Sequence, residues 1–157
     1  MAWTAVASAS RSPVPSCTSS QLQVLASEQL AALGNGAVAF DVVNNGARCA
    51  LKGYPDVVFF NTKGRSVFSR DVHTSSMLFA GPSASLVTLA PKGIATFGVS
   101  FGDNPVNSES CPQVVKAVVQ LVSGVGRFSA EFPLALTPCN GLIVTSIEAG
   151  AWPRPNG

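Results

Sequence analysis

The chain has 157 residues, of which 46% are hydrophobic and 11% are charged, and its ten basic and eight acidic side chains give a net charge of +2. This length suits one domain with a core of its own. The apolar content excludes a disordered chain, the weak charge gives no support for nucleic-acid binding, and there is no run of about 20 apolar residues that would predict a transmembrane helix.

Residues 1–16 are rich in Ala, Ser and Pro, and we interpret them as a flexible tail or as the remnant of a signal peptide. They have neither the basic start nor the apolar run of an export signal. Their Ala-Val-Ala-Ser-Ala-Ser stretch nevertheless resembles the small-residue end of such a signal. We therefore expect the native precursor to be longer.

Residues 20–33 are ambiguous, because their start alternates like a strand while the rest contains helix formers. We favour a strand from Leu22 and then a loop or short turn that ends near Gly34. Residues 36–43 alternate clearly, with apolar side chains at every second position, and predict a half-buried strand.

Two hairpins are expected in the next stretch. Asn44-Asn45-Gly46 predicts a tight turn with positive φ angles, and residues 47–51 form the returning strand. Residues 57–60 are a continuous apolar run, which favours a strand that is buried on both faces. The polar residues 61–64 then turn the chain into a second return at residues 65–68.

Residues 69–82 show no clear period, and we interpret them as a long loop. The rest of the chain alternates in short stretches that Gly, Pro and Asn separate, which is typical of strands and turns. Further strands are therefore expected at residues 86–89, 95–101, 115–121, 127–132 and 142–147, and residues 149–157 read as a Pro-rich tail.

Short strands with frequent turns and almost no helix predict an all-β fold. We expect a single antiparallel β-sandwich of immunoglobulin-like type over residues 17–148, with about seven to nine strands. The Cys-Trp-Cys spacing of true immunoglobulin domains is absent, since Trp3 and Trp152 both lie near the chain ends.

The four cysteines, Cys17, Cys49, Cys111 and Cys139, form no close pair, and the chain has one histidine. A zinc site usually has closely paired ligands, so two disulfides are the better interpretation, and they indicate an oxidising compartment. Four cysteines allow three connectivities. We favour Cys17–Cys49 and Cys111–Cys139, because neighbours in sequence tend to be neighbours in space.

Several blocks around these cysteines form a pattern. The most specific is Cys-x-Leu-x-Gly-Tyr-Pro, which starts at Cys49 and follows the Asn-x-Gly-like turn, and a Leu-Ala-Pro-x-Gly turn comes later at residues 89–93. A first cysteine precedes a strand, and a third and a late fourth cysteine complete the pattern. From Cys17 to Ile147 the chain resembles the domain of unknown function 4232 family.

This resemblance implies an exported β-sandwich, because the family occurs in secreted and lipid-anchored envelope proteins of actinobacteria. The resemblance implies no catalytic residues for this chain, because the family has no assigned activity. The chain departs from the pattern at Lys92, where a second small residue is common, and it shows no lipobox. Pro15 makes a poor cleavage site before Cys17, so we interpret Cys17 as a bridge cysteine, and lipid anchoring stays open.

One motif has the form of a nucleophile elbow, G-x-S-x-G, with Ser100 at its centre. An elbow needs a strand that feeds a helix, and its histidine partner comes later in the chain. Here the strand alternation continues through Ser100, and the only histidine, His73, comes earlier. Ser100 is more simply an outward-facing strand residue.

His73 is the other candidate centre. Asp71 could orient its imidazole if the segment is extended, and Ser75 and Ser76 nearby would suggest a small hydrolase. Met77 would instead suggest a soft metal such as copper. Each site needs further groups that the sequence does not supply, and no pair of acids is poised for glycoside chemistry. We therefore predict no enzymatic activity, no cofactor and no metal site.

Half of the ten basic residues fall within a short stretch: Arg48, Lys52, Lys63, Arg65 and Arg70. Hairpin pairing could bring several of them onto one face, which would suit an anionic polysaccharide, a phospholipid headgroup or an acidic protein surface. The simpler interpretation is ordinary solubility charge along edge strands.

We expect a non-enzymatic binding domain that is secreted or attached to the cell envelope, with an unknown ligand. Its partner would be an envelope or host protein, or an anionic polysaccharide or lipid, rather than a nucleic acid. The alternatives are a small hydrolase or metal-binding protein centred on His73, and a structural module of an envelope assembly.

Overall fold

The computed structural model describes residues 13–32, 34–68, 71–73, 85–105, 110–121, 125–139 and 141–150, with the backbone alone for residues 32, 68 and 71–73. This part of the chain forms one 3₁₀ turn, η1, and twelve strands. Their bounds are η1 (Ser19–Gln21), β1 (Leu22–Ala32), β2 (Asn35–Asn44), β3 (Cys49–Lys52), β4 (Asp56–Phe60), β5 (Ser66–Phe68), β6 (Asp71–His73), β7 (Leu86–Leu89), β8 (Ile94–Gly102), β9 (Val114–Leu121), β10 (Gly126–Leu136), β11 (Leu142–Val144) and β12 (Glu148–Ala149).

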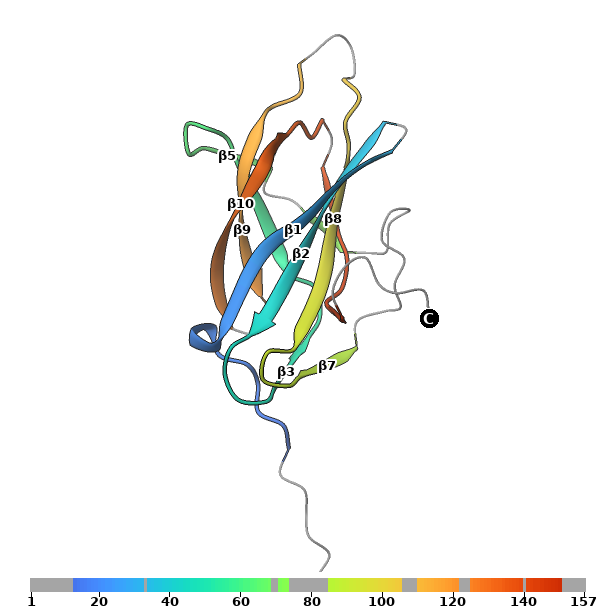
Figure 1. Ribbon diagram of the computed structural model, residues 1–157. Helices are drawn as coiled ribbons and strands as arrows, with labels where there is room; N and C mark the ends of the chain where they lie inside the picture. Colours follow the sequence, from blue (N-terminus) through green and yellow to red (C-terminus); the bar gives the residue numbers. More distant parts are fainter. Residues whose placement is uncertain are drawn as a thin grey trace, which may run out of the picture.

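The strands form a β-sandwich (Figure 1). One sheet has the order β1-β2-β8-β11-β6, with β12 also paired to β8, and the facing sheet has the order β10-β9-β4-β5. A small third sheet, β3-β7, lies at the lower end of the molecule in Figure 1. The all-β sandwich class predicted from the sequence is confirmed.

The strands are more numerous than the expected seven to nine because four of them, β5, β6, β11 and β12, have only two or three residues. The other eight strands have four residues or more. The sheets are also not purely antiparallel, since β6 pairs with β11 in parallel. The segment expected as one long loop, residues 69–82, therefore contributes a short strand near its start.

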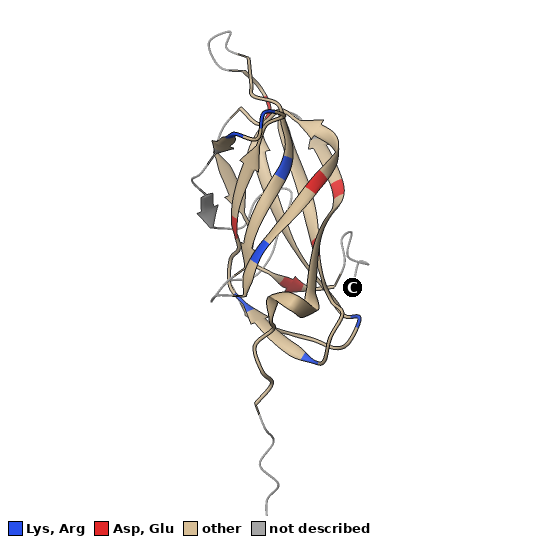
Figure 2. Ribbon diagram, turned by 90° about the vertical axis from the view of Figure 1, so that its left-hand side faces the viewer, with Lys and Arg blue, Asp and Glu red and all other residues tan. Residues whose placement is uncertain are grey.

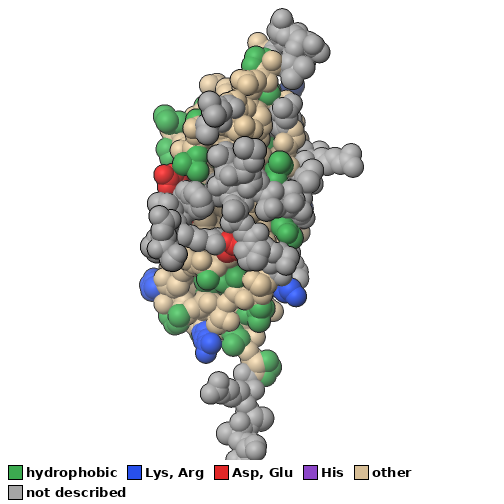
Figure 3. Space-filling view, turned by 90° about the vertical axis from the view of Figure 1, so that its right-hand side faces the viewer, with side chains coloured by type: hydrophobic (Ala, Val, Ile, Leu, Met, Phe, Trp, Pro, Cys, Tyr) green, Lys and Arg blue, Asp and Glu red, His purple; other side chains and the backbone are tan. Residues whose placement is uncertain are grey.

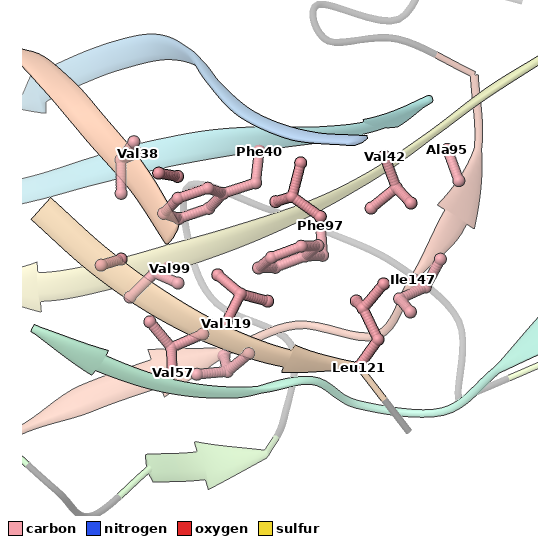
Figure 4. Close-up of a cluster of buried hydrophobic side chains, with 14 of the residues drawn as sticks. Val38, Phe40, Val42, Val57, Ala95, Phe97, Val99, Val119, Leu121 and Ile147 are labelled. Atoms are coloured by element: carbon pink, nitrogen blue, oxygen red, sulfur yellow. The ribbon is translucent and has the colours of Figure 1, made fainter. Parts of the chain in front are cut away.

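The core fills the space between the two large sheets with side chains from both (Figure 4). The rings of Phe40 and Phe97, on adjacent strands of one sheet, stack at 5.0 Å. The ring centroid of Phe132, from the facing sheet, lies 6.2 Å from that of Phe40 and 5.3 Å from that of Phe59. Each such fully buried side chain stabilises the fold by about 1.5–3 kcal/mol, so this aromatic cluster binds the sheets together.

Both predicted disulfides are present. Cys17–Cys49 joins the segment before η1 to β3, with Cα atoms 4.8 Å apart. Cys111–Cys139 joins the residues before β9 to those after β10, with Cα atoms 4.7 Å apart. The first pair is buried in the core, whereas the second is partly exposed.

The first hairpin differs from the sequence-based expectation. β1 does not give way to a loop after its first residues but continues to Ala32, paired with β2 along its length. A register shift between Ala26 and Glu28 absorbs one residue. The helix formers of this segment lie in a strand because tertiary pairing outweighs a weak local propensity.

The Asn44-Asn45-Gly46 turn is not a tight hairpin. β2 pairs with β1 and β8, and β3 pairs with β7, so the chain here crosses from one sheet to another. None of the three residues has a positive φ angle. The Asn44 side chain shapes the crossing instead, because its Oδ1 accepts a hydrogen bond from the Gly46 amide at 2.9 Å.

Two other expected turns are present. Residues 61–65 join β4 to β5, with Asn61 Oδ1 accepting hydrogen bonds from the Lys63 and Arg65 amides at 3.0 Å. Residues 90–93 join β7 to β8, and Lys92 there has a φ of 64°, the one positive value among the described non-glycine residues. A glycine would take that conformation without strain.

β4 is buried on one face only, contrary to the expectation from its apolar run. Val57 and Phe59 point into the core, while Val58 and Phe60 are half-buried on the outer side of the sheet. The apolar run predicted the strand correctly but predicted too much burial for its outer face. Apolar side chains such as Val58 and Phe60 are common on protein surfaces and do not require a second covering layer.

The expected tails lie mostly outside the described residues, which omit 1–12 and 151–157. Residues 13–16 are described, and Ser16 forms a parallel bridge with Ala50 of β3. No described helix is long and apolar enough to cross a membrane.

Candidate binding groove

The N-terminal segment 13–16 runs beside β3 as one wall of a groove. The Ala50 amide donates a hydrogen bond to the Pro15 carbonyl at 2.9 Å, and the Cys17 amide donates to the Ala50 carbonyl at 3.1 Å. The Cys17–Cys49 disulfide fixes the same two segments covalently. The wall is therefore held by backbone pairing and by a buried bridge.

β7 lies along the other edge of β3. Its register places Leu86 directly opposite Lys52, and Thr88 opposite Ala50. Leu86 is 65% exposed, while its neighbour Val87 points into the core. Residues that face each other across an antiparallel pair have Cβ atoms about 5 Å apart, so an exposed leucine and an exposed lysine begin side by side on this edge.

Together these segments enclose an open groove of ≈ 400 Å³, which we call the β3–β7 groove. Ligand sites in proteins typically have volumes of about 300–1,000 Å³. Lys52 is the one charged residue among the described residues that line it. The lining residues are Pro13, Val14, Ser16, Ala50, Leu51, Lys52, Leu86 and Val125.

The surface at this end of the molecule has the same character. In Figure 3, hydrophobic side chains gather at the end that carries β3 and β7, and Lys and Arg side chains surround them. An apolar floor with basic groups at its margin suits a ligand that is apolar along its length and anionic at one end.

The predicted basic surface is divided by the fold. Lys52 is exposed at the end of β3 and lines the groove, and Arg48 is exposed just before the start of the same strand. Lys63 and Arg65 are exposed in the β4–β5 turn, which lies toward the opposite end of the sandwich (Figure 1). Because β3 pairs with β7 and not with β4 or β5, these two pairs are not brought together. Arg70 lies outside the described residues.

The other candidate centres are only partly described. His73 ends β6, and Asp71 begins it, so the segment is extended as the orienting pair would require. Their side chains lie outside the described part, as do Ser75, Ser76 and Met77. The described residues include no group of three or more His, Cys, Asp or Glu that could hold a metal ion.

Ser100 lies in the middle of β8, paired with Ala37 and Ile143. It is on the outer side of its strand, as predicted, but it is only 6% exposed. Its buried Oγ makes no hydrogen bond in the part of the chain that the structure describes. A serine held within a continuous strand has no elbow geometry.

The sequence interpretation identified Lys52 but missed Leu86. Period-two alternation contained the signal, since inward Val87 and Leu89 require Leu86 to face outward. The contribution of Ser16 and Val125 could not be found in this way, because it depends on how distant segments meet at one end of the sandwich.

A family model for "Domain of unknown function (DUF4232)" matches residues 17–152. The chain belongs to this family. The match extends over every described element of this DUF4232 domain and includes all the residues that line the groove from Ala50 onward. No curated protein matches the chain, and no solved structure matches it either.

Proposed function

We propose that this DUF4232 domain is a non-enzymatic binding module that works outside the cytoplasm. The β3–β7 groove is its binding site, and the ligand is an apolar chain that ends in an anionic group. The observation that carries the proposal is the pairing of exposed Leu86 with Lys52 on the wall of the ≈ 400 Å³ groove.

The chemistry of the groove supports this ligand class over a polysaccharide. Sugars present hydroxyl groups that need many polar partners, whereas this lining is mostly apolar. An apolar chain would cover Leu86 and gain about 25 cal/mol for each Å² removed from water. An anionic headgroup beside Lys52 would add attraction at the rim.

The two disulfides support a place in an oxidising compartment, since such bonds persist outside the reducing cytosol. We propose further that the protein is secreted or attached to an actinobacterial cell envelope, because the family occurs in proteins of this kind. A signal peptide in a longer precursor belongs to the same proposal.

The non-enzymatic part of the proposal is supported by the position of Ser100 within a continuous strand. Hydrolysis of ester or glycoside substrates that is lost in His73→Ala or Ser100→Ala would contradict it. Loss in His73→Ala together with copper or zinc binding would favour the metal alternative.

Binding to the groove is measured by isothermal titration calorimetry with single-chain amphiphiles as probes, each kept below its critical micelle concentration. We expect dodecyl phosphate and dodecanoate to bind more tightly than dodecanol, and dodecyltrimethylammonium to bind least. Lys52→Glu should weaken the anionic probes about tenfold, equivalent to about 1.4 kcal/mol, and leave dodecanol nearly unchanged. Leu86→Ser should weaken all the probes that bind.

Two matched variants serve as controls because their side chains are exposed away from the groove. Lys63→Glu makes the same charge change in the β4–β5 turn, and Leu134→Ser removes a leucine that is 72% exposed on β10. Both should bind like the unaltered protein. Failure of every probe to bind, or equal losses in the control variants, would overturn the proposal.

A further inference from the structure

The outer side of the β10-β9-β4 sheet carries a second surface, independent of the groove. Cross-strand register arranges its residues in three rows of three. We call this set the outer face: Asp56, Gln120 and Arg127 in the first row, Val58, Val118 and Ser129 in the second, and Phe60, Lys116 and Glu131 in the third.

The centre of the outer face is apolar and hollowed. Val58, Phe60 and Val118 are half-buried, although they point away from the core. With Asp56, Gln120 and Arg127 they line a hollow of ≈ 140 Å³. This volume is too small for the ligand sites that proteins commonly form but adequate for side chains of a partner.

The charges of the outer face balance, with two acids and two bases. Arg127 on β10 and Asp56 on β4 stand at opposite ends of the first row. In the third row Lys116 Nζ lies over the Phe60 ring, 5.5 Å from its centroid, so this ammonium leans toward β4 and away from Glu131 on β10. Figure 2 shows basic and acidic positions interspersed on this side of the molecule.

We propose that the outer face binds a second copy of this chain in a two-fold symmetric dimer. A two-fold axis parallel to β9 exchanges the β10 and β4 positions. It brings Arg127 against Asp56 of the second copy, and Glu131 against the Lys116 ammonium over Phe60. An axis across the strands instead pairs Arg127 with Glu131, and Lys116 with Asp56. Either axis joins both bases to both acids around the valines, which is the self-complementarity that an isologous interface needs.

The interface is small. Three rows on three strands cover well under the roughly 800 Å² that each partner buries in a standard interface, so the dimer belongs to the weak class. We expect a dissociation constant in the micromolar range or above, and an equilibrium that shifts with protein concentration.

Sedimentation equilibrium of the full chain over about 10 μM to 1 mM tests the proposal directly. The unaltered protein should move from monomer to dimer across this range. Val118→Lys should abolish the dimer and Arg127→Glu should raise its dissociation constant at least tenfold. Arg65→Glu, in the β4–β5 turn, is the matched charge control and should leave it unchanged. Circular dichroism melting confirms that each variant is folded.

Compensating charge changes distinguish the two axes. Arg127→Glu combined with Asp56→Arg should restore dimerisation for the axis parallel to β9, and Arg127→Glu combined with Glu131→Arg should restore it for the other. A monomer at 1 mM, a dimer that survives Val118→Lys, or failure of both double variants to restore it would overturn the proposal.

Discussion

Asn44 is the residue that joins the most separate parts of the fold. Its side chain is completely buried, and its Nδ2 donates to the Ala47 carbonyl at 2.9 Å and to the Leu89 carbonyl at 3.2 Å. Its Oδ1 accepts from Gln21 Nε2 at 2.9 Å. One amide therefore ties the end of η1, the crossing after β2 and the end of β7 to each other.

Asn44→Ala should destabilise the protein by about 2–4 kcal/mol, because a fully buried amide loses all its hydrogen bonds, including those to the Leu89 carbonyl and from the Gly46 amide. The free energy of unfolding in urea measures this loss. Asn45→Ala is the control, since Asn45 is exposed and its Oδ1 accepts one hydrogen bond, from Lys92 Nζ at 2.9 Å. It should cost less than about 0.5 kcal/mol. Equal losses in the two variants would contradict the role given to Asn44.

Ser100→Ala should leave the protein at least as stable as before and raise the free energy of unfolding by up to about 1 kcal/mol. Its Oγ is buried without a hydrogen bond in the described structure, and removing such a group relieves its desolvation penalty. Urea denaturation checks this. A loss above 1 kcal/mol would show that the hydroxyl has a partner.

At this scale the sequence allowed some side chains to be placed but not their partners. Alternation is a local property, so the inward positions of Phe40 and Val42 and the outward position of Ser100 followed from it. The hydrogen bonds of Asn44 could not be predicted, since they reach carbonyls about 45 residues away at Leu89 and Ala90.

The two disulfides differ from each other in burial. They close loops of similar size, with sequence separations of 32 and 28 residues. In the chain-entropy model each contributes about 3.5 kcal/mol. Cys17 and Cys49 are also buried, 3% and 1% exposed, and fix a wall of the β3–β7 groove.

Replacing Cys17 and Cys49 by Ala should therefore cost more stability than replacing Cys111 and Cys139, by about 1–3 kcal/mol beyond the shared entropic loss. Only the first replacement should also weaken binding of dodecyl phosphate. Denaturant unfolding and calorimetry on both double variants measure the two effects. Equal effects, or a larger loss for the exposed pair, would show that burial does not distinguish the bridges.

Strand positions could be predicted well, and strand partners could not. The β4–β5 and β7–β8 turns followed from their Asn, Pro and Gly residues. The Asn44-Asn45-Gly46 segment has the same local composition but crosses between sheets, because β8 occupies the place beside β2 that a hairpin partner would take. Local composition predicts that the chain turns at this point, but tertiary packing decides which strand the next segment pairs with.

At the scale of the molecule, the sandwich has two separate surfaces. The β3–β7 groove lies at one end and combines an apolar lining with Lys52, whereas the outer face lies on the side of the β10-β9-β4 sheet. Because they share no residue, a dimer through the outer face would leave both grooves open and hold two of them in one assembly. Ligand binding and dimerisation can therefore be tested independently.

The fold class and the disulfides could be predicted because period-two alternation and cysteine spacing extend along the whole chain. The groove could not, since its walls come from residues 13–16, β3, β7 and Val125, which only the folded topology brings together. The basic residues lie close together in the sequence, but β3 pairs with β7 rather than with β4 or β5, which separates them in space.

Mapping the amide chemical shifts of the ¹⁵N-labelled protein during titration with dodecyl phosphate shows whether the β3–β7 groove receives an apolar chain with an anionic end. We expect the shifts to concentrate at Ser16, Ala50, Lys52, Leu86 and Val125 and to saturate together. Shifts that spread evenly over the surface, or that centre on Val58, Phe60 and Val118 of the outer face, would contradict it.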